Sequence, residues 1–389
     1  MNFDQIIERR GTHSAKWDNM EAFSGISPDE GIPMWVADME FRAPEVVQRA
    51  LQKMVDHGIY GYYGGNDSYL DAVQWWAENR HGWLPPREGI YVTNGIVNGL
   101  QLCLQAWTKP GDGVVIFTPV YHVFPRLIRA QERVAVECAL VQRGDRYEMD
   151  FDTYESQMTG NEKMLVLCSP HNPGGRVWSP EELQQVADFA KRHDLILVSD
   201  EIHCDLTLPG HTHTAMTRVD PSIMDRLVMM TSATKTFNLA GGHVGNVIIC
   251  DEKLRRDFAK ALASFGGSQN SFGQVMSEAA YSPEGAEWLD ALLVYLAENA
   301  RIFEEGVNAI PGLQVQHLEG TYLAWVDFSG TGMTPEEVRT RIKDAGIAVN
   351  DGISFGKGGE DYQRFNLATQ KVRVEEVVRR MRAAFSDLQ

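Results

Sequence analysis

The sequence predicts an α/β fold in which a mostly parallel central sheet is flanked by helices and joined to a smaller α/β lobe. Short, continuous apolar runs alternate with amphipathic segments through the middle of the chain. Such runs are typical of strands that are buried on both faces of a parallel sheet. The chain has 389 residues, of which 43% are hydrophobic, so it exceeds one ordinary domain and can fill a large core.

The central sheet is expected from six apolar runs, at residues 90–93, 114–117, 164–168, 195–199, 227–231 and 244–250. The segment 179–182, Ser-Pro-Glu-Glu, is a capping box with proline at the first helical position, and it predicts the start of a helix. The apolar stripe that follows can pack on the sheet and consists of Leu183, Val186, Ala187 and Ala190.

The last third of the chain has a different pattern. Residues 283–285, Pro-Glu-Gly, open a long helical stretch that runs through Arg301 and beyond. Residues 321–327 predict a half-buried strand, and a second capping box at 334–337 predicts a helix that ends near Asp344. These elements indicate the smaller α/β lobe.

Composition limits the partners and the location of the protein. A formal net charge of −17 argues against nucleic acid or an anionic membrane surface as a partner. No apolar run approaches membrane-spanning length, and residues 1–10 lack the apolar core of a signal peptide. The cysteines are odd in number and indicate buried thiols in a reducing compartment: Cys103, Cys138, Cys168, Cys204 and Cys250. We therefore expect a cytoplasmic protein.

Four side chains of complementary chemistry each follow an apolar run: Tyr121, Asn172, Asp200 and Lys235. Ligands of parallel sheets gather at the carboxyl ends of the strands, so we expect one pocket to collect these side chains. They offer an amine for a Schiff base, an acid for a ring nitrogen, an amide for a ring hydroxyl and an aromatic ring for stacking. These are the parts that hold pyridoxal phosphate and tune its electronics.

A buried lysine near a cation loses proton affinity, so the amine of Lys235 could attack an aldehyde and later take a Cα proton. An ionised Asp200 would keep the pyridine nitrogen protonated, Asn172 would donate to the ring hydroxyl oxygen, and Tyr121 would stack on the ring. Taken singly, each residue has an ordinary alternative: a surface lysine, a helix-capping acid, a turn asparagine and a core tyrosine. Residues 93–97 form a glycine turn before a helix, which is either a phosphate cradle or a plain βα turn.

Several motifs carry a resemblance to known enzymes. They are Arg-Gly-Thr at 10–12, the segment 33–41, the segment 169–175 and Ser-Asp-Glu-Ile-His at 199–203. By these motifs the chain resembles the fold-type I pyridoxal-phosphate enzymes of the aspartate aminotransferase superfamily, and within them the MalY/PatB family of cystathionine β-lyases and C–S lyases. The resemblance runs from about residue 9 to the last helix. It implies a large cofactor-binding domain over 48–283 and a small domain built from 1–47 and 284–389.

The resemblance also assigns cofactor contacts. It implies phosphate contacts from the backbone of Gly95 and Ile96 and from the hydroxyls of Ser232 and Thr234. Tyr62 matches the tyrosine that reaches the phosphate of a neighbouring subunit, which implies a homodimer with shared sites. Tyr60 and Tyr63 remain alternatives for that position.

Substrate contacts follow from the same resemblance. Arg364 matches the arginine that clamps the substrate carboxylate, a task suited to a planar guanidinium, although a surface arginine is the alternative. Val36, Tyr121 and Tyr322 are candidates for lining the side-chain pocket.

The expected reaction is the β-elimination of cystathionine or another cysteine S-conjugate to a thiol, pyruvate and ammonia. Many aminotransferases of the superfamily carry an arginine eight residues after the lysine, where this chain has His243. A lyase tolerates a weaker phosphate clamp than a transaminase, so His243 favours elimination. An aminotransferase is the nearest alternative, and a regulatory protein with an enzyme-like sensor domain is a more distant one.

A second cluster could suggest a metal site. His203, Cys204, Asp205, His211 and His213 lie close together in the sequence, but their spacing fits no usual zinc pattern. We expect no metal, and we expect His203 to line the cofactor pocket.

Overall fold

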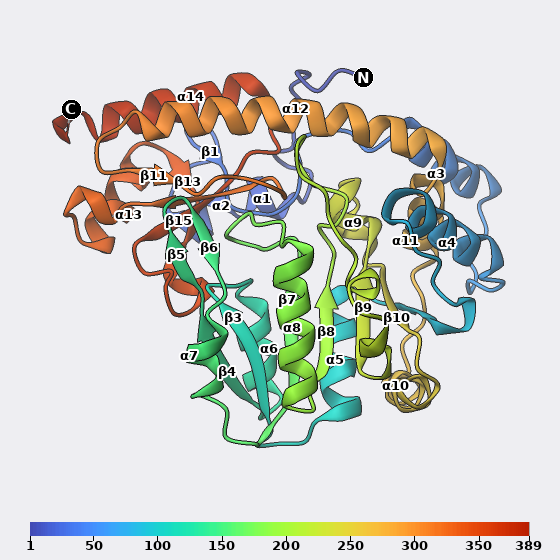
Figure 1. Ribbon diagram of the computed structural model, residues 1–389. Coiled ribbons are helices and arrows are strands. Elements are labelled where there is room, and N and C mark those ends of the chain that lie inside the picture. Colours follow the sequence, from blue (N-terminus) through green and yellow to red (C-terminus); the bar gives the residue numbers. More distant parts are fainter. Residues whose placement is uncertain (389) are drawn as a thin grey trace.

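The computed structural model describes residues 1–388. Its centre is a seven-stranded sheet (Figure 1) in the order β2 (Ile90–Thr93), β10 (Gly245–Ile249), β9 (Leu227–Thr231), β8 (Ile196–Asp200), β7 (Glu162–Cys168), β3 (Gly113–Thr118) and β4 (Val134–Ala139). Only β10 runs antiparallel to its neighbours. Each of the six predicted runs forms a strand, and β4 is added at the edge.

Helices cover both faces of this sheet. On one face lie α5 (Ile96–Trp107), α6 (Val123–Ala130) and α10 (Glu252–Phe265), and on the other lies α8 (Pro180–Arg192). Side chains alternate between the two faces along β3. Val114 and Ile116 pack in the core under α5, α6 and α10, whereas Val115 and Phe117 pack in the core on the side of α8. The capping box of α8 is present as predicted, with Ser179 and Glu182 each accepting the backbone N–H of the other.

The smaller lobe contains a four-stranded antiparallel sheet in the order β11 (Gln314–Val315), β12 (Leu323–Asp327), β15 (Tyr362–Asn366) and β14 (Asn350–Asp351). The long helix α12 (Pro283–Asn308) lies beside α14 (Lys371–Ala384) over this lobe (Figure 1). The predicted second capping box opens α13 (Pro335–Asp344). Near the N-terminus, β1 (Ile32–Pro33) pairs in parallel with β13 (Ile347–Ala348).

The predicted half-buried strand at 321–327 is wrong in its burial. All five residues of β12 are buried, and Trp325 is fully enclosed. One side of the strand meets a hairpin of β5 (Val141–Arg143) and β6 (Arg146–Glu148), where the Trp325 indole donates to the Tyr147 hydroxyl at 3.1 Å. The hairpin comes from a distant part of the sequence, so its cover could not be read from the strand itself.

The helices and the cysteines bear on the expected location of the protein. Across residues 1–388, no helix is both long and apolar enough to cross a bilayer. All five cysteines are free thiols; four are buried and Cys250 is half-buried.

Candidate functional site

A cavity of about 280 Å³ lies at the carboxyl ends of the parallel strands. Tyr121 follows β3, Asn172 follows β7, Asp200 ends β8, and Lys235 lies in the short helix α9 (Ala233–Thr236) after β9. All four line this cavity. The fold therefore brings together the four residues predicted to share one pocket, although Tyr121 and Lys235 lie far apart in the sequence.

Lys235 carries a perturbed amine. Its Nζ donates to the carbonyl oxygen of Ala37 at 2.7 Å. Burial and the positive charge of Arg364 lower the pKa of Lys235 to about 8, against the opposing pull of Asp38 and Asp200. A substantial fraction of this amine is therefore neutral, and nucleophilic, near neutral pH.

Asp200 is a buried acid whose pKa is also shifted by burial, in this case upward. Burial and the charge of Glu201 raise the pKa of Asp200 to about 7, although the N–H of Ile202 (3.1 Å to Oδ1) and the charge of Lys235 favour ionisation. A carboxyl group held in this balance gains strongly from a cationic ligand atom. The arrangement suits a protonated ring nitrogen.

The helix start that was predicted to hold phosphate opens onto the cavity. Gly95 and Ile96 line it at the N-terminus of α5, and Gly95 has a φ of +86° that a side chain would strain. Thr234 also lines the cavity. Ser232 lies behind Thr234: its hydroxyl donates to the Val244 carbonyl at 2.6 Å and is 2.7 Å from the Thr234 Oγ1. Ser232 therefore supports Thr234 from the buried side.

Asn172 and His203 present defined groups to the cavity. The side-chain oxygen of Asn172 accepts from Arg364 at 3.0 Å, so its amide nitrogen is the group left for a ligand. His203 is buried, and its Nδ1 has no partner among residues 1–388. Burial and the cations Lys235 and Arg364 lower the pKa of His203 to about 3, so the imidazole is neutral.

Arg364 is a buried cation without a carboxylate partner in the described part of the chain. It donates to Asn172, to the Trp35 carbonyl at 3.0 Å and to the side chain of Asn350 at 2.6 Å, while its Nε has no partner. Its guanidinium lies 4.9 Å from the ring centre of Phe355. Burial lowers the pKa of Arg364 to about 10, which still leaves it charged at neutral pH. A substrate carboxylate would supply the missing acceptor.

Besides Ser232 and Arg364, three more predicted residues lie outside the lining of the cavity. The Tyr322 hydroxyl donates to the Ala37 carbonyl at 3.0 Å, next to the cavity rather than in its lining. Val36 adjoins the same loop, and its carbonyl accepts from Asn366. Tyr62 is 98% exposed and lies outside the cavity of its own chain.

The main residue that sequence reasoning missed is Ala37. Its carbonyl oxygen accepts from both Lys235 and Tyr322. An alanine backbone group carries no chemical signal in a sequence, so only the unusual segment 33–41 pointed to this loop.

The histidine–cysteine cluster does not assemble as a whole. Within residues 1–388, the group with metal-ligand proximity is His81, Cys204 and Asp205, whose ligand atoms lie within 4.8 Å of one another. Asp205 already accepts hydrogen bonds from His81, from Trp76 and from Thr236. His213 instead bonds to Glu201 at 2.7 Å, and His203 lines the cofactor cavity. Hydrogen bonds thus already engage the carboxylates of Asp205 and Glu201 in this region.

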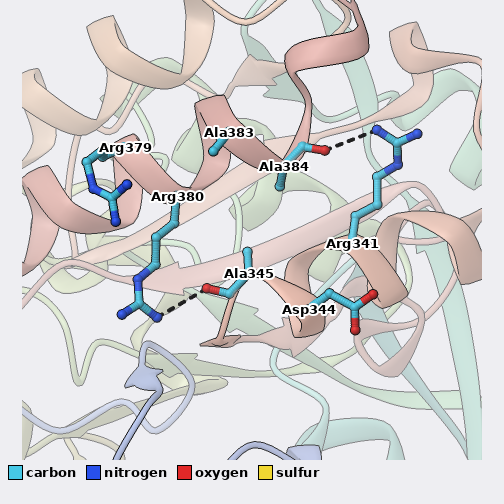
Figure 2. A pocket seen from close by; sticks show the side chains of 7 residues that line it. All are labelled: Arg341, Asp344, Ala345, Arg379, Arg380, Ala383 and Ala384. Carbon is cyan, nitrogen blue, oxygen red and sulfur yellow. Dashed lines mark hydrogen bonds between the residues drawn. The ribbon is translucent and has the colours of Figure 1, made fainter.

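A larger hollow, of about 550 Å³, lies between α13 and α14 (Figure 2). Its arginines are already engaged: Arg341 bonds to the Ala384 carbonyl and to Asp387, and Arg380 bonds to the Ala345 carbonyl and to Glu376. Because these guanidinium groups are satisfied, the hollow offers less to an anion than the single buried Arg364.

Comparison with known proteins agrees with this geometry. The family model "Aminotransferase class I and II" matches residues 36–381. Cystathionine β-lyase PatB of Bacillus subtilis (strain 168) is 37% identical, over 99% of this chain and 100% of PatB. The crystal structure of cystalysin from Treponema denticola, which contains pyridoxal 5'-phosphate, has a TM-score of 0.95 at 36% identity, over 100% and 99% of the two chains. A PLP-bound putative aminotransferase from Clostridium difficile 630 has a TM-score of 0.95 at 34% identity, over 99% of both.

The fold and the site thus define a class of protein: the chain belongs to the aminotransferase class I and II family. Within it, the chain groups with the cystathionine β-lyases of the PatB and MalY type. The predicted fold class and the predicted family are both confirmed.

Proposed function

We propose that the protein is a pyridoxal-phosphate-dependent C–S β-lyase acting on cystathionine or a related cysteine S-conjugate. The observation that carries the proposal is Arg364, a buried guanidinium with an unfilled Nε beside the cavity of Lys235 and Asp200. It fits an amino-acid carboxylate next to a reactive amine. PatB, a relative of full-length coverage, is named a cystathionine β-lyase, and cystalysin holds the same cofactor.

The residues present fit this cofactor. Asp200 would face the ring nitrogen, the amide of Asn172 the ring hydroxyl, and Tyr121 the ring plane, while the N-terminus of α5 and Thr234 would hold the phosphate. When bound, the cofactor supplies an electron sink for the Cα carbanion.

The chain's own residues then perform two tasks. Arg364 orients the substrate by its carboxylate, and the Lys235 amine removes the Cα proton, for which a pKa of about 8 is well matched. The bond from Cβ to sulfur breaks, and the electron pair leaves with the thiolate, which takes up a proton. The remaining aminoacrylate consumes one water and gives pyruvate and ammonia.

The test is pyruvate release from L-cystathionine by the holoenzyme in the absence of any keto acid, with Lys235→Ala as the matched inactive variant. Steady release by the natural protein and loss in the variant are expected. A strict requirement for added keto acid would instead identify an aminotransferase, the alternative supported by the family model. His243 lines the cavity at the position where many aminotransferases carry arginine, which favours elimination.

We further propose a homodimer with shared sites. Tyr62 is almost fully exposed, and nearby apolar side chains are exposed as well: Val55, Ile59, Tyr60 and Phe272. A groove of about 730 Å³ between α3 (Glu45–His57) and α11 (Ser271–Ala280) lies beside them. Coexpressed Tyr62→Ala and Lys235→Ala chains should regain activity through mixed dimers, whereas independent sites would not permit this.

We also propose a division into two domains and a location in the cytoplasm. The division into a large domain (48–283) and a small domain (1–47 with 284–389) is supported by the pairing of β1 with β13. The reduced cysteines support a cytoplasmic location.

A further inference from the structure

Arg126 is an exposed arginine on α6, the helix that begins just after Tyr121. Within residues 1–388 its guanidinium has no hydrogen bond and no ion pair. Its neighbour on the same helix, Arg129, differs: it donates to the Glu137 carboxylate at 2.5 Å. An unpaired arginine is notable in a chain whose net charge is −17, since acids are abundant.

A line of contacts connects Arg126 to the buried arginine. His122 precedes Arg126 by four residues, which places both on one face of the helix. The His122 ring packs against Tyr121 (5.0 Å between centroids) and edge-on against Phe355 (5.6 Å). Phe355 in turn lies under the guanidinium of Arg364. Arg364 therefore contacts an aromatic cluster that reaches the cavity through Tyr121, and Arg126 lies on the helix face that bears His122 of the same cluster.

Electrostatics agrees with this placement. Burial, together with the charges of Arg364 and Arg126, lowers the pKa of His122 to about 4. The phenol of Tyr121 is buried, which raises its pKa, but it too lies within the field of both arginines. His122 is thus neutral and leaves the two positive charges uncompensated, while its buried Nδ1 has no partner.

We propose that Arg126 binds an anionic group at the distal end of the leaving thiol, so that preferred substrates are cysteine S-conjugates carrying a second carboxylate. This inference rests on the proposed function. Arg364 takes the α-carboxylate, and the thiol portion extends past Tyr121 and His122 toward Arg126. A guanidinium can bond both oxygens of a carboxylate, and solvent exposure limits the gain to roughly three- to tenfold in kcat/KM.

The experiment compares two conjugates of similar size, S-carboxyethyl-L-cysteine and S-propyl-L-cysteine, by kcat/KM for pyruvate release from the holoenzyme. The natural protein should prefer the carboxyethyl conjugate by roughly three- to tenfold, and Arg126→Gln should abolish that ratio. Arg129→Gln is the matched control on the same helix and should retain the preference. A preference that survives in Arg126→Gln, or that is absent in the natural protein, would overturn the proposal.

A binding measurement separates this inference from the reaction. Aminopimelate and aminoheptanoate replace sulfur by carbon and cannot undergo C–S cleavage. Calorimetric titration of the holoenzyme should show tighter binding of aminopimelate, and Arg126→Gln should remove that difference. If neither conjugate releases pyruvate while the binding preference holds, the lyase proposal fails and the role of Arg126 stands; equal binding of the two analogues counts against Arg126.

Discussion

Burial and the charge of Arg364 act in the same direction on the Lys235 amine and lower its pKa to about 8. A lysine at its ordinary pKa of 10.5 would be almost wholly protonated at pH 7, whereas about a tenth of this amine is neutral there. Geometry alone would not make this residue reactive. The cation that we propose as the partner of a substrate carboxylate would thus also prepare the lysine for attack on a carbonyl.

This coupling gives a pH prediction. Attachment of pyridoxal phosphate to cofactor-free protein requires the neutral amine, so its rate should rise with pH through about 8 and level off above. Stopped-flow absorbance measures the rate. Arg364→Gln removes a cation, raises the pKa of Lys235 and should move the inflection to higher pH. An inflection that stays in place in the variant would contradict the electrostatic explanation.

Site residues could be predicted from the sequence where a side chain with suitable chemistry directly follows a predicted strand. Asp200, Asn172 and Lys235 each carry a functional group at the end of an apolar run, so strand topology was enough to place them together. Ser232 and Thr234 could not be distinguished, because which hydroxyl faces the cavity depends on the turn at α9. The Ala37 carbonyl could not be found at all, since backbone groups are the same in every residue.

At the scale of elements, Asp205 links α9, the helix that carries Lys235, to a second helix. Its carboxylate accepts from Trp76 and His81 of α4 (Asp67–His81) and from Thr236 of α9, at 2.7–2.9 Å. Burial opposes ionisation, but these hydrogen bonds and the charge of His81 outweigh it and lower the pKa of Asp205. The short helix that carries Lys235 is therefore anchored to α4 through the buried, ionised carboxylate of Asp205.

Asp205→Asn should destabilise the holoenzyme by about 2–3 kcal/mol, because an amide has one acceptor oxygen for three donors and adds unpaired donors of its own. Urea unfolding measures the change. Glu252→Gln is the control: Glu252 forms an exposed pair with Arg256, and its loss should change stability by less than about 0.5 kcal/mol. If both variants lowered the free energy of unfolding by the same amount, the proposed role of Asp205 in linking the two helices would be contradicted.

Element boundaries show where the sequence was and was not sufficient. Both capping boxes form because their signal lies within four consecutive residues. The burial of β12 was wrong because the hairpin that covers it is contributed from residues 141–148. Local signals were read correctly, and a long-range contact was not.

At the scale of the whole molecule, a buried charge cluster fastens the N-terminal segment to the last helix. Glu40 is 2% exposed and pairs with Lys16 (3.1 Å), Arg9 (2.7 Å) and Arg373 of α14 (3.1 Å). Burial opposes ionisation, but these cations and a hydrogen bond from the Trp17 indole lower the pKa of Glu40 to about 2. The segment leading to Ala37 is thereby fixed over the site.

Since the folded pKa of Glu40 lies below its ordinary value of 4.5, its contribution is complete above about pH 4.5 and is lost as pH falls toward 2. Glu40→Gln should cost about 3–5 kcal/mol at pH 7, because Lys16, Arg9 and Arg373 lose the buried carboxylate that they share, and Lys16 keeps only the more distant Asp38, at 3.5 Å. The difference in the free energy of unfolding between the natural protein and the variant, measured with urea, should become smaller as pH falls from 4.5 to 2. A gap independent of pH would show that Glu40 acts by packing alone.

The central claim concerns one bond at one residue. Borohydride reduction of cofactor-replete protein, followed by peptide mass analysis, should place the reduced pyridoxyl phosphate group on the peptide that contains Lys235, and Lys235→Ala should carry no label. Labelling of another lysine, or an unlabelled Lys235 in protein saturated with cofactor, would contradict the account.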